Sequence, residues 1–165
     1  MVTGYDIYWD QGTGTEVIKN ASYTLLSFTV TGLTTGTTYN FRLYANNIVG
    51  SSEPTSVFPI IAANVPDPPT EFTKDESNSN LTQVALIWTA PINNGGSAVT
   101  GYKIRWDAGT GGSMQDYTGS YIGGTSLIAT AGINPGTLYK FNIASINIIG
   151  SSTFSLVEIV AGTPK

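Results

Sequence analysis

The chain has 165 residues, of which 41% are hydrophobic and only 11% are charged, and its formal net charge is −4. It contains neither cysteine nor histidine, which excludes disulfides and thiolate chemistry and removes the commonest general base and metal ligand. No basic cluster provides a footprint for nucleic acid, and no apolar run approaches the length of a membrane span. We therefore expect no cofactor, no metal and no nucleic-acid partner. The lack of histidine counts against an enzyme without excluding one, since carboxylates alone can catalyse.

The chain repeats itself at long range. Residues 2–10 (VTGYDIYWD) return as residues 99–107 (VTGYKIRWD), and residues 47–52 (NIVGSS) return as residues 147–152 (NIIGSS). A repeat unit of this length is a whole domain rather than one turn of a solenoid. The sequence therefore predicts two copies of one module.

The predicted elements are strands throughout. Apolar residues alternate with polar ones in residues 83–89, 101–107 and 138–146, a pattern with the period of a half-buried strand. Glycine- and asparagine-rich turns at residues 93–97 and 108–112 separate these strands. No helical stripe lasts more than one turn. This pattern predicts an antiparallel β-sandwich.

The predicted domain boundary lies in residues 62–69 (AANVPDPP). Three prolines in four residues cannot sit in a central strand, and they stiffen a short linker. We therefore assign residues 1–65 to a first, partial module and residues 66–165 to a second, complete one. The last residues, 160–165 (VAGTPK), look like the start of another linker.

Several features of the second module resemble the fibronectin type III family. They are Pro68-Pro69, Trp88 before Ala90-Pro91, the loop and strand start at residues 93–102, the motif INPGTLY at residues 133–139, and residues 145–150. The resemblance implies an all-β, antiparallel immunoglobulin-like β-sandwich. It also implies a tyrosine corner at Tyr139 and at its repeat, Tyr39. Trp9, Trp88 and Trp106 lie on the inward side of the alternation, so we predict that these tryptophans and the two tyrosines form structural core.

The first module has no counterpart of Trp88 or of the first two strands of the resembled fold, A and B, so it would consist of strands C to G. One interpretation is a piece of a longer tandem array. The other is that another chain supplies the missing strands, because the inward row would otherwise be bare and the sheet edges unpaired. That row is Tyr5, Ile7, Trp9, Tyr39, Phe41 and Leu43.

Candidate chemical sites are few. The acidic residues Asp67, Glu71, Asp75 and Glu76 cluster near the linker, but they lack the spacing of a calcium loop and are better explained as edge charges. Asp10 and Asp107 are repeats of one turn in different modules, so they are not a catalytic pair. We expect no catalytic, cofactor or metal residues.

The predicted outer faces carry apolar and tyrosine residues, which favour contact between modules or chains. They include Ala85 and Ala144, and the candidate interaction surface is Tyr8, Tyr44, Ile87 and Ile146. Asn20 and Asn80 match the N-glycosylation pattern, which would place the protein in a eukaryotic secretory route if it is used.

The resulting functional hypothesis is a non-catalytic structural or adhesion module pair from an extracellular or cell-surface array. Such a pair could be a fibre subunit whose partners are copies of itself or neighbouring modules. The alternatives are a spacer module of a secreted carbohydrate-active enzyme, or a receptor-type pair that binds ligand through residues 93–97 and 147–152. These roles rest partly on the resemblance, because a fold alone does not fix a function.

Overall fold

The computed structural model describes residues 1–117 and 123–160, and within them it contains strands and turns but no helix. Accordingly, no helix in the described part could cross a membrane. The chain divides into two compact units, Met1–Ala63 (unit 1) and Asn64–Lys165 (unit 2). Asn64 and Val65 thus belong to unit 2, whereas the sequence division placed them in the first module. Of the predicted second linker, residues 160–165, Val160 ends strand β11, and residues 161–165 lie outside the described residues.

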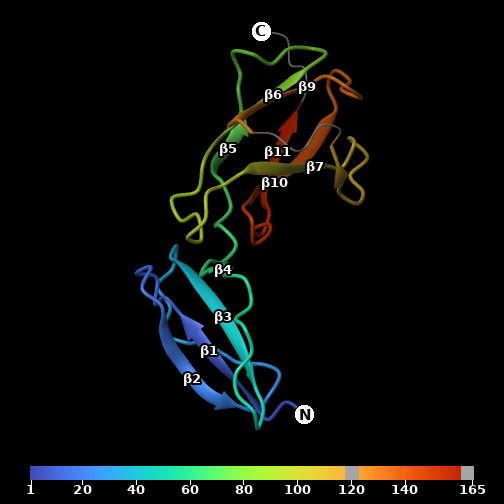
Figure 1. Cartoon of the computed structure of the whole chain (residues 1–165). Coiled ribbons are helices and arrows are strands. Elements are labelled where there is room, and N and C mark those ends of the chain that lie inside the picture. The colour runs from blue at the N-terminus through green and yellow to red at the C-terminus, as the bar shows by residue number, and fades with distance from the viewer. Residues whose placement is uncertain (118–122, 161–165) are drawn as a thin grey trace. The chain divides into compact units, whose positions relative to one another are not determined.

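Unit 2 consists of two antiparallel sheets (Figure 1). One has the strand order β5-β6-β9 and the other the order β11-β10-β7-β8. The strands are β5 (Thr70–Lys74), β6 (Val84–Thr89), β7 (Gly101–Trp106), β8 (Gln115–Asp116), β9 (Ser126–Ala129), β10 (Leu138–Ile146) and β11 (Ser155–Val160). This is the predicted all-β sandwich with antiparallel strands.

The core of unit 2 lies between its two sheets. Val84 and Leu86 of β6 and Ile104 of β7 are completely buried, and so are Phe141 and Ile143 of β10. These residues occupy alternate positions of their strands, so one face of each strand provides the core. Full burial of one such side chain contributes about 1.5–3 kcal/mol to folding.

A tyrosine closes one end of each unit. The Tyr139 hydroxyl accepts a hydrogen bond from the Asn134 main-chain N–H at 2.8 Å and donates one to the Gly132 carbonyl at 2.9 Å. In unit 1, the Tyr39 hydroxyl accepts from the Thr34 N–H at 2.9 Å. Both tyrosines are buried. The predicted corner is therefore present twice, with one more hydrogen bond in unit 2.

Unit 1 is built on one four-stranded antiparallel sheet of order β2-β1-β3-β4 (Figure 1). The strands are β1 (Gly4–Trp9), β2 (Val17–Tyr23), β3 (Thr38–Asn46) and β4 (Phe58–Ile61). The register repeats that of unit 2, since Ile7 pairs with Leu43 just as Ile104 pairs with Ile143. Unit 1 has no described counterpart of the β5-β6-β9 sheet.

Several burial predictions need correction. Ala85 and Ala144 were expected on exposed outer faces, yet both are buried; a methyl group exposes little surface even on an outer face, so strand alternation alone is a poor guide to its burial. Trp9 and Trp106 were expected in the core and are half-buried, and Trp106 packs against the buried core cluster of unit 2. Each lies at the end of its strand and stacks on the corner tyrosine, with centroid distances of 5.6 Å for Trp9 and 5.8 Å for Trp106. Trp88 is buried, at 5% exposure.

The candidate functional site on unit 1

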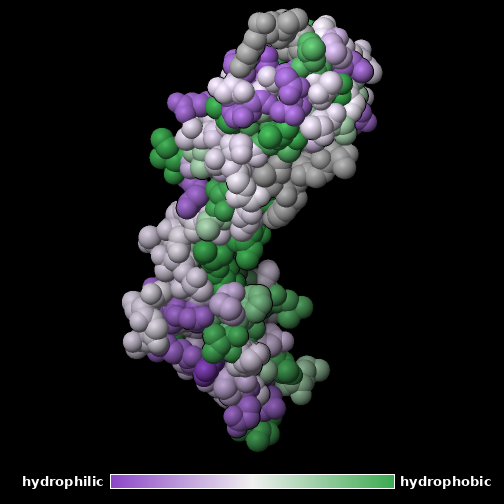
Figure 2. Space-filling view, turned by 90° about the horizontal axis from the view of Figure 1, so that it is seen from above, coloured by the Kyte–Doolittle hydropathy of each residue, from purple (hydrophilic) through white to green (hydrophobic). Residues whose placement is uncertain are grey.

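One face of the unit 1 sheet is apolar and incompletely covered, and we call it the open face. Two adjoining hollows lie on it, and both are lined by Ile7, Phe28 and Leu43. Leu25 and Leu26 line the first hollow, and Phe41, Phe58 and Ile60 line the second. In the space-filling view, hydrophobic side chains reach the surface of unit 1, which is the half without grey atoms (Figure 2).

Comparison with unit 2 shows how much surface this face leaves in water. Leu43 is 42% exposed, whereas Ile143, at the same register position of unit 2, is completely buried. Ile60, which pairs with Tyr39, is 43% exposed, whereas Ile159, which pairs with Tyr139, is 4% exposed. The sheets match, so the difference comes from the β5-β6-β9 layer that covers the face in unit 2.

The predicted bare row is only partly bare. Ile7 is buried, although the missing strands were expected to leave it bare, and Tyr39 is buried as its core assignment requires. Tyr5, Trp9 and Phe41 are half-buried. Phe28 lines both hollows together with Ile7, and its ring packs edge-on against Tyr23 at 5.1 Å. Trp9 stacks on Tyr39 at the other end of the row. The row is therefore less exposed than the sequence implied. Its exposed member is Leu43, which lines both hollows.

The two repeated aspartates each close a turn. Asp107 accepts main-chain hydrogen bonds from Gly109 at 2.9 Å and Lys140 at 3.0 Å. Asp10 accepts the corresponding bonds from Gly12 at 2.9 Å and Asn40 at 3.0 Å. The main-chain hydrogen bond from Asn40, and after it the bond from Gly12, lowers the pKa of Asp10 below its ordinary value. Both carboxylates serve local structure, and each is tied within its own unit.

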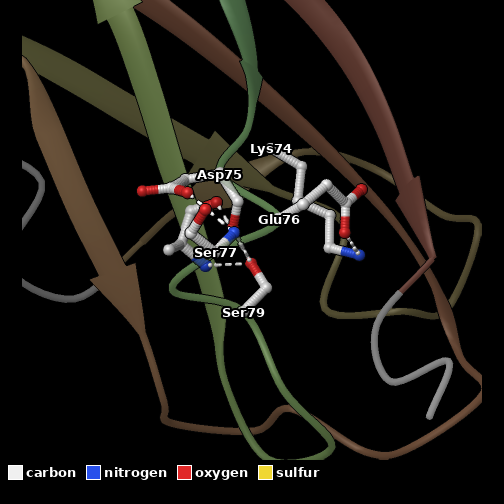
Figure 3. Close-up of polar contacts among 6 residues, drawn as sticks. Lys74, Asp75, Glu76, Ser77 and Ser79 are labelled. Atoms are coloured by element: carbon white, nitrogen blue, oxygen red, sulfur yellow. Dashed lines mark hydrogen bonds and ion pairs between the residues drawn. The ribbon is translucent and has the colours of Figure 1, made fainter. Parts of the chain in front are cut away.

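The acidic residues near the linker do not gather into a site. Asp75 accepts a hydrogen bond from the Ser77 N–H at 2.9 Å, and its carbonyl accepts one from the Ser79 hydroxyl at 2.7 Å (Figure 3). Glu76 pairs with Lys74 at 2.8 Å. Among the described residues, no group of three or more acidic or other ligating side chains could hold a metal ion. These contacts stabilise the turn between β5 and β6.

The remaining candidate residues do not line the two hollows of the open face. Tyr8 and Tyr44 are half-buried and pack against each other, with ring centroids 5.1 Å apart. Ile87 is exposed and Ile146 is half-buried, on different sheets of unit 2. Within unit 1 the two tyrosines thus form one pair, whereas within unit 2 Ile87 and Ile146 do not share a sheet.

The two candidate glycosylation sites differ in their presentation. Asn80 is exposed in the turn between β5 and β6, where its side-chain oxygen accepts a hydrogen bond from the Thr82 N–H at 2.9 Å. Asn20 is half-buried within β2 and pairs with Ile7. Of the two, Asn80 is the more accessible side chain.

Sequence reasoning missed the role of Asn147. Its side-chain amide donates hydrogen bonds to the Asn64 carbonyl at 2.7 Å and to the Asn94 carbonyl at 3.0 Å. Its side-chain oxygen accepts from the Ile149 N–H at 2.9 Å. Asn147 therefore holds both candidate ligand loops and the start of unit 2 together. One feature of the sequence could have pointed to this role: the same residue, Asn47, occurs at the matching position of the first repeat.

Comparison with known proteins agrees with this geometry. The model of the family described as fibronectin type III domain matches residues 1–60 and 67–160. The chain belongs to the fibronectin type III family. In a solved structure of titin domains A168–A170, 54% of that chain aligns with 95% of this one, with a TM-score of 0.67 and 21% identity. At that identity the likeness supports the fold alone.

The chain is similar to a part of several longer proteins. The chain is 31% identical over 161 residues to a Kelch domain-containing protein of Saccharolobus solfataricus, covering 97% of this chain and 21% of that protein. It is 34% identical over 150 residues to endoglucanase B of Cellulomonas fimi, a match that covers 85% of this chain and 13% of the endoglucanase. It is 33% identical over 149 residues to human myomesin-2, a match that covers 83% of this chain and 10% of myomesin-2. The chain thus spans about a fifth or less of these relatives.

Proposed function

We propose that this chain is a non-catalytic structural module pair of a longer extracellular or cell-surface array. In this role it joins neighbouring modules into a fibre or filament through the open face. The observation that carries the proposal is the 42% exposure of Leu43 at a position that is completely buried in unit 2. An apolar face of this kind is stabilised by contact with another surface.

Two further observations support a structural role. Asp10, Asp107 and Asp75 each accept a hydrogen bond from a nearby main-chain N–H, as expected of carboxylates that hold turns. The relatives are also much longer than the chain, which matches between 10% and 21% of their length. A module pair of this kind serves as a spacer whose partners are copies of itself or neighbouring modules.

Light scattering and negative-stain microscopy over a range of concentrations test the proposal. We expect oligomers that grow with concentration, because bare apolar faces associate. Leu43→Asp should reduce them, since a carboxylate opposes burial of the face. Ile48→Asp is the matched control, because Ile48 is also an exposed aliphatic residue but lies outside both hollows. A monodisperse monomer whose unit 1 unfolds cooperatively would contradict the proposal.

A second candidate function is a spacer module of a secreted carbohydrate-active enzyme. The 34% identity to endoglucanase B of Cellulomonas fimi, over 85% of this chain, favours it. In that case the catalytic domain would be encoded beside this segment. Sequencing the flanking gene tests this alternative directly: an adjoining glycosidase domain would support it, and further modules of the same family would favour the array.

A further inference from the structure

The segment of unit 2 that precedes β5 is bound to a loop of the same unit. The Asn64 N–H donates a hydrogen bond to the Gly95 carbonyl at 2.8 Å, and the Asp67 N–H donates one to the Asn93 carbonyl at 3.0 Å. These bonds hold the main chain at both ends of the segment. A stretch held in this way belongs to the domain that holds it, and it does not behave as a flexible linker.

The packing of this tethered segment, residues 64–67, is close. Gly95 has a φ of +72°, and a Cβ placed on it would overlap the Asn64 carbonyl oxygen and lie 2.6 Å from the Val65 carbonyl oxygen. Pro66 is buried. Because only glycine combines a positive φ with so near an approach of two main chains, the loop is shaped around the segment.

The Asn147 side chain joins the tethered segment to the loops at residues 93–97 and 147–152. Its amide nitrogen donates to the Asn64 carbonyl at 2.7 Å and to the Asn94 carbonyl at 3.0 Å. Its oxygen accepts from the Ile149 N–H at 2.9 Å. A side-chain amide has two N–H donors and one oxygen, and here every one of these groups is used. Three stretches of chain therefore meet at one side chain.

The main chain just before the tethered segment is bonded within unit 1. The Ala62 N–H donates to the Thr37 carbonyl at 2.9 Å, and the Ala62 carbonyl accepts from the Gly36 N–H at 2.8 Å. Unit 1 thus holds the chain as far as Ala62, and unit 2 holds it from Asn64. Ala63 lies between them and makes no main-chain hydrogen bond within the part of the chain that the structure describes.

We infer that the junction is a latch with a one-residue hinge. While Asn147 holds the tethered segment, bending is confined to Ala63. When the latch opens, residues 64–67 join the hinge. Four extended residues span at most about 14 Å, which is the upper limit of the added length. Because local opening costs less free energy than global unfolding, the latch opens while the core of unit 2 stays folded.

Such a latch limits how far a spacer can bend and provides reserve length under tension. The inference goes beyond the proposed function, because it concerns residues 62–67 and requires no contact at the open face. It also applies whether the chain belongs to an array of modules or to an enzyme.

Nuclear magnetic resonance of the whole chain tests the latch residue by residue, at a concentration where light scattering shows single chains. Amide exchange should be slow at Asn64 and Asp67 and fast at Ala63. Asn147→Asp removes the amide donor but keeps an oxygen for the Ile149 N–H. We expect exchange at Asn64 and Asp67 to become at least about tenfold faster, and exchange in β10 to stay within about twofold.

The same samples report on the hinge. Relaxation of the ¹⁵N nuclei gives a rotational correlation time for each unit. A longer hinge lets each unit tumble more independently, so both correlation times should become shorter in Asn147→Asp. This readout would not move if Asn147 only fixed the conformation of its own loop.

Two further variants complete the design. Asn47→Asp is the matched control, because Asn47 is the repeat of Asn147 and its oxygen likewise accepts from the Val49 N–H, at 2.8 Å, but within unit 1. It should leave exchange at Asn64 within about twofold. Gly95→Ala should release the tethered segment through the loop instead, with exchange at Asn64 at least about tenfold faster.

Three results would overturn the inference. Exchange at Asn64 and Asp67 as fast as at Ala63 in the unaltered chain would show that nothing holds the segment. Unchanged exchange in Asn147→Asp and Gly95→Ala would show that neither residue holds it. An equal loss of protection in β10 would show that Asn147 stabilises the whole sandwich. A chain that is monomeric at every concentration would contradict fibre assembly, and slow exchange at Asn64 in that chain would still support the latch.

Discussion

The matched positions Leu43 and Ile143 allow the effect of the covering layer to be measured. We predict that Ile143→Ala destabilises unit 2 by about 2–5 kcal/mol, the usual range for truncating a fully buried aliphatic side chain. Leu43→Ala removes a side chain that is already 42% exposed. Full burial of a leucine contributes about 1.5–3 kcal/mol, so somewhat more than half of it gives about 1–2 kcal/mol. No closed cavity forms, because the site already opens into two hollows.

Hydrogen exchange at increasing urea concentrations measures both free energies in the intact chain, since peptides from each unit report separately. Ile143→Ala should lower protection in β10 and its partners while unit 1 keeps its own stability. Leu43→Ala should lower protection in β3 by the smaller amount. Equal costs for the two substitutions would refute the reasoning, because Leu43 would then be as well covered in solution as Ile143.

Three further predictions concern single residues. Trp88→Ala should lower the unfolding free energy of unit 2 by about 3–5 kcal/mol, and an unchanged calorimetric transition would contradict its core position. Tyr139→Phe should destabilise unit 2 by about 1–3 kcal/mol, and more than Tyr39→Phe destabilises unit 1, because its hydroxyl makes two main-chain hydrogen bonds rather than one. The pKa of Asp10 is lower in the folded than in the unfolded chain, so its stabilising effect is present above the unfolded value and is lost as the pH falls through the folded value. Between neutral and acid pH, Asp10→Asn should therefore lose less unit 1 stability than the unaltered chain does, as measured by urea titration at both pH values. An identical pH dependence in the two chains would count against this role of Asp10.

The fold could be predicted because several local signals agree. Alternation defines the inner faces of β6, β7 and β10, and turn residues separate the strands. The tyrosine corner is a short motif that fixes one chain crossing, and it occurs in both repeats. Trp88 and Tyr139 are buried as that reading requires.

Burial at single positions was harder to predict than the fold. Alternation tells on which side of a strand a residue lies, but not what covers it. Ala144 faces the predicted side and is still completely buried, and Trp106 points inward but lies at the end of its strand. The amide of Asn147 binds main-chain oxygens 83 and 53 residues away. No local pattern could announce contacts at that separation.

Comparison of the two units shows how far the burial of a side chain depends on the sheet that carries it and how far on the second layer packed against that sheet. Both have the same strand register and a corner tyrosine, so neither feature accounts for the exposure of Leu43. The β5-β6-β9 layer does, since it lies over Ile143 in unit 2. Unit 1 keeps its hydrogen-bonded sheet, and Ile7 is buried beside residues 25–28. Leu43 and Ile60 on the same face remain exposed. The sheet of unit 1 thus has all four strands paired, while its apolar face keeps Leu43 and Ile60 exposed.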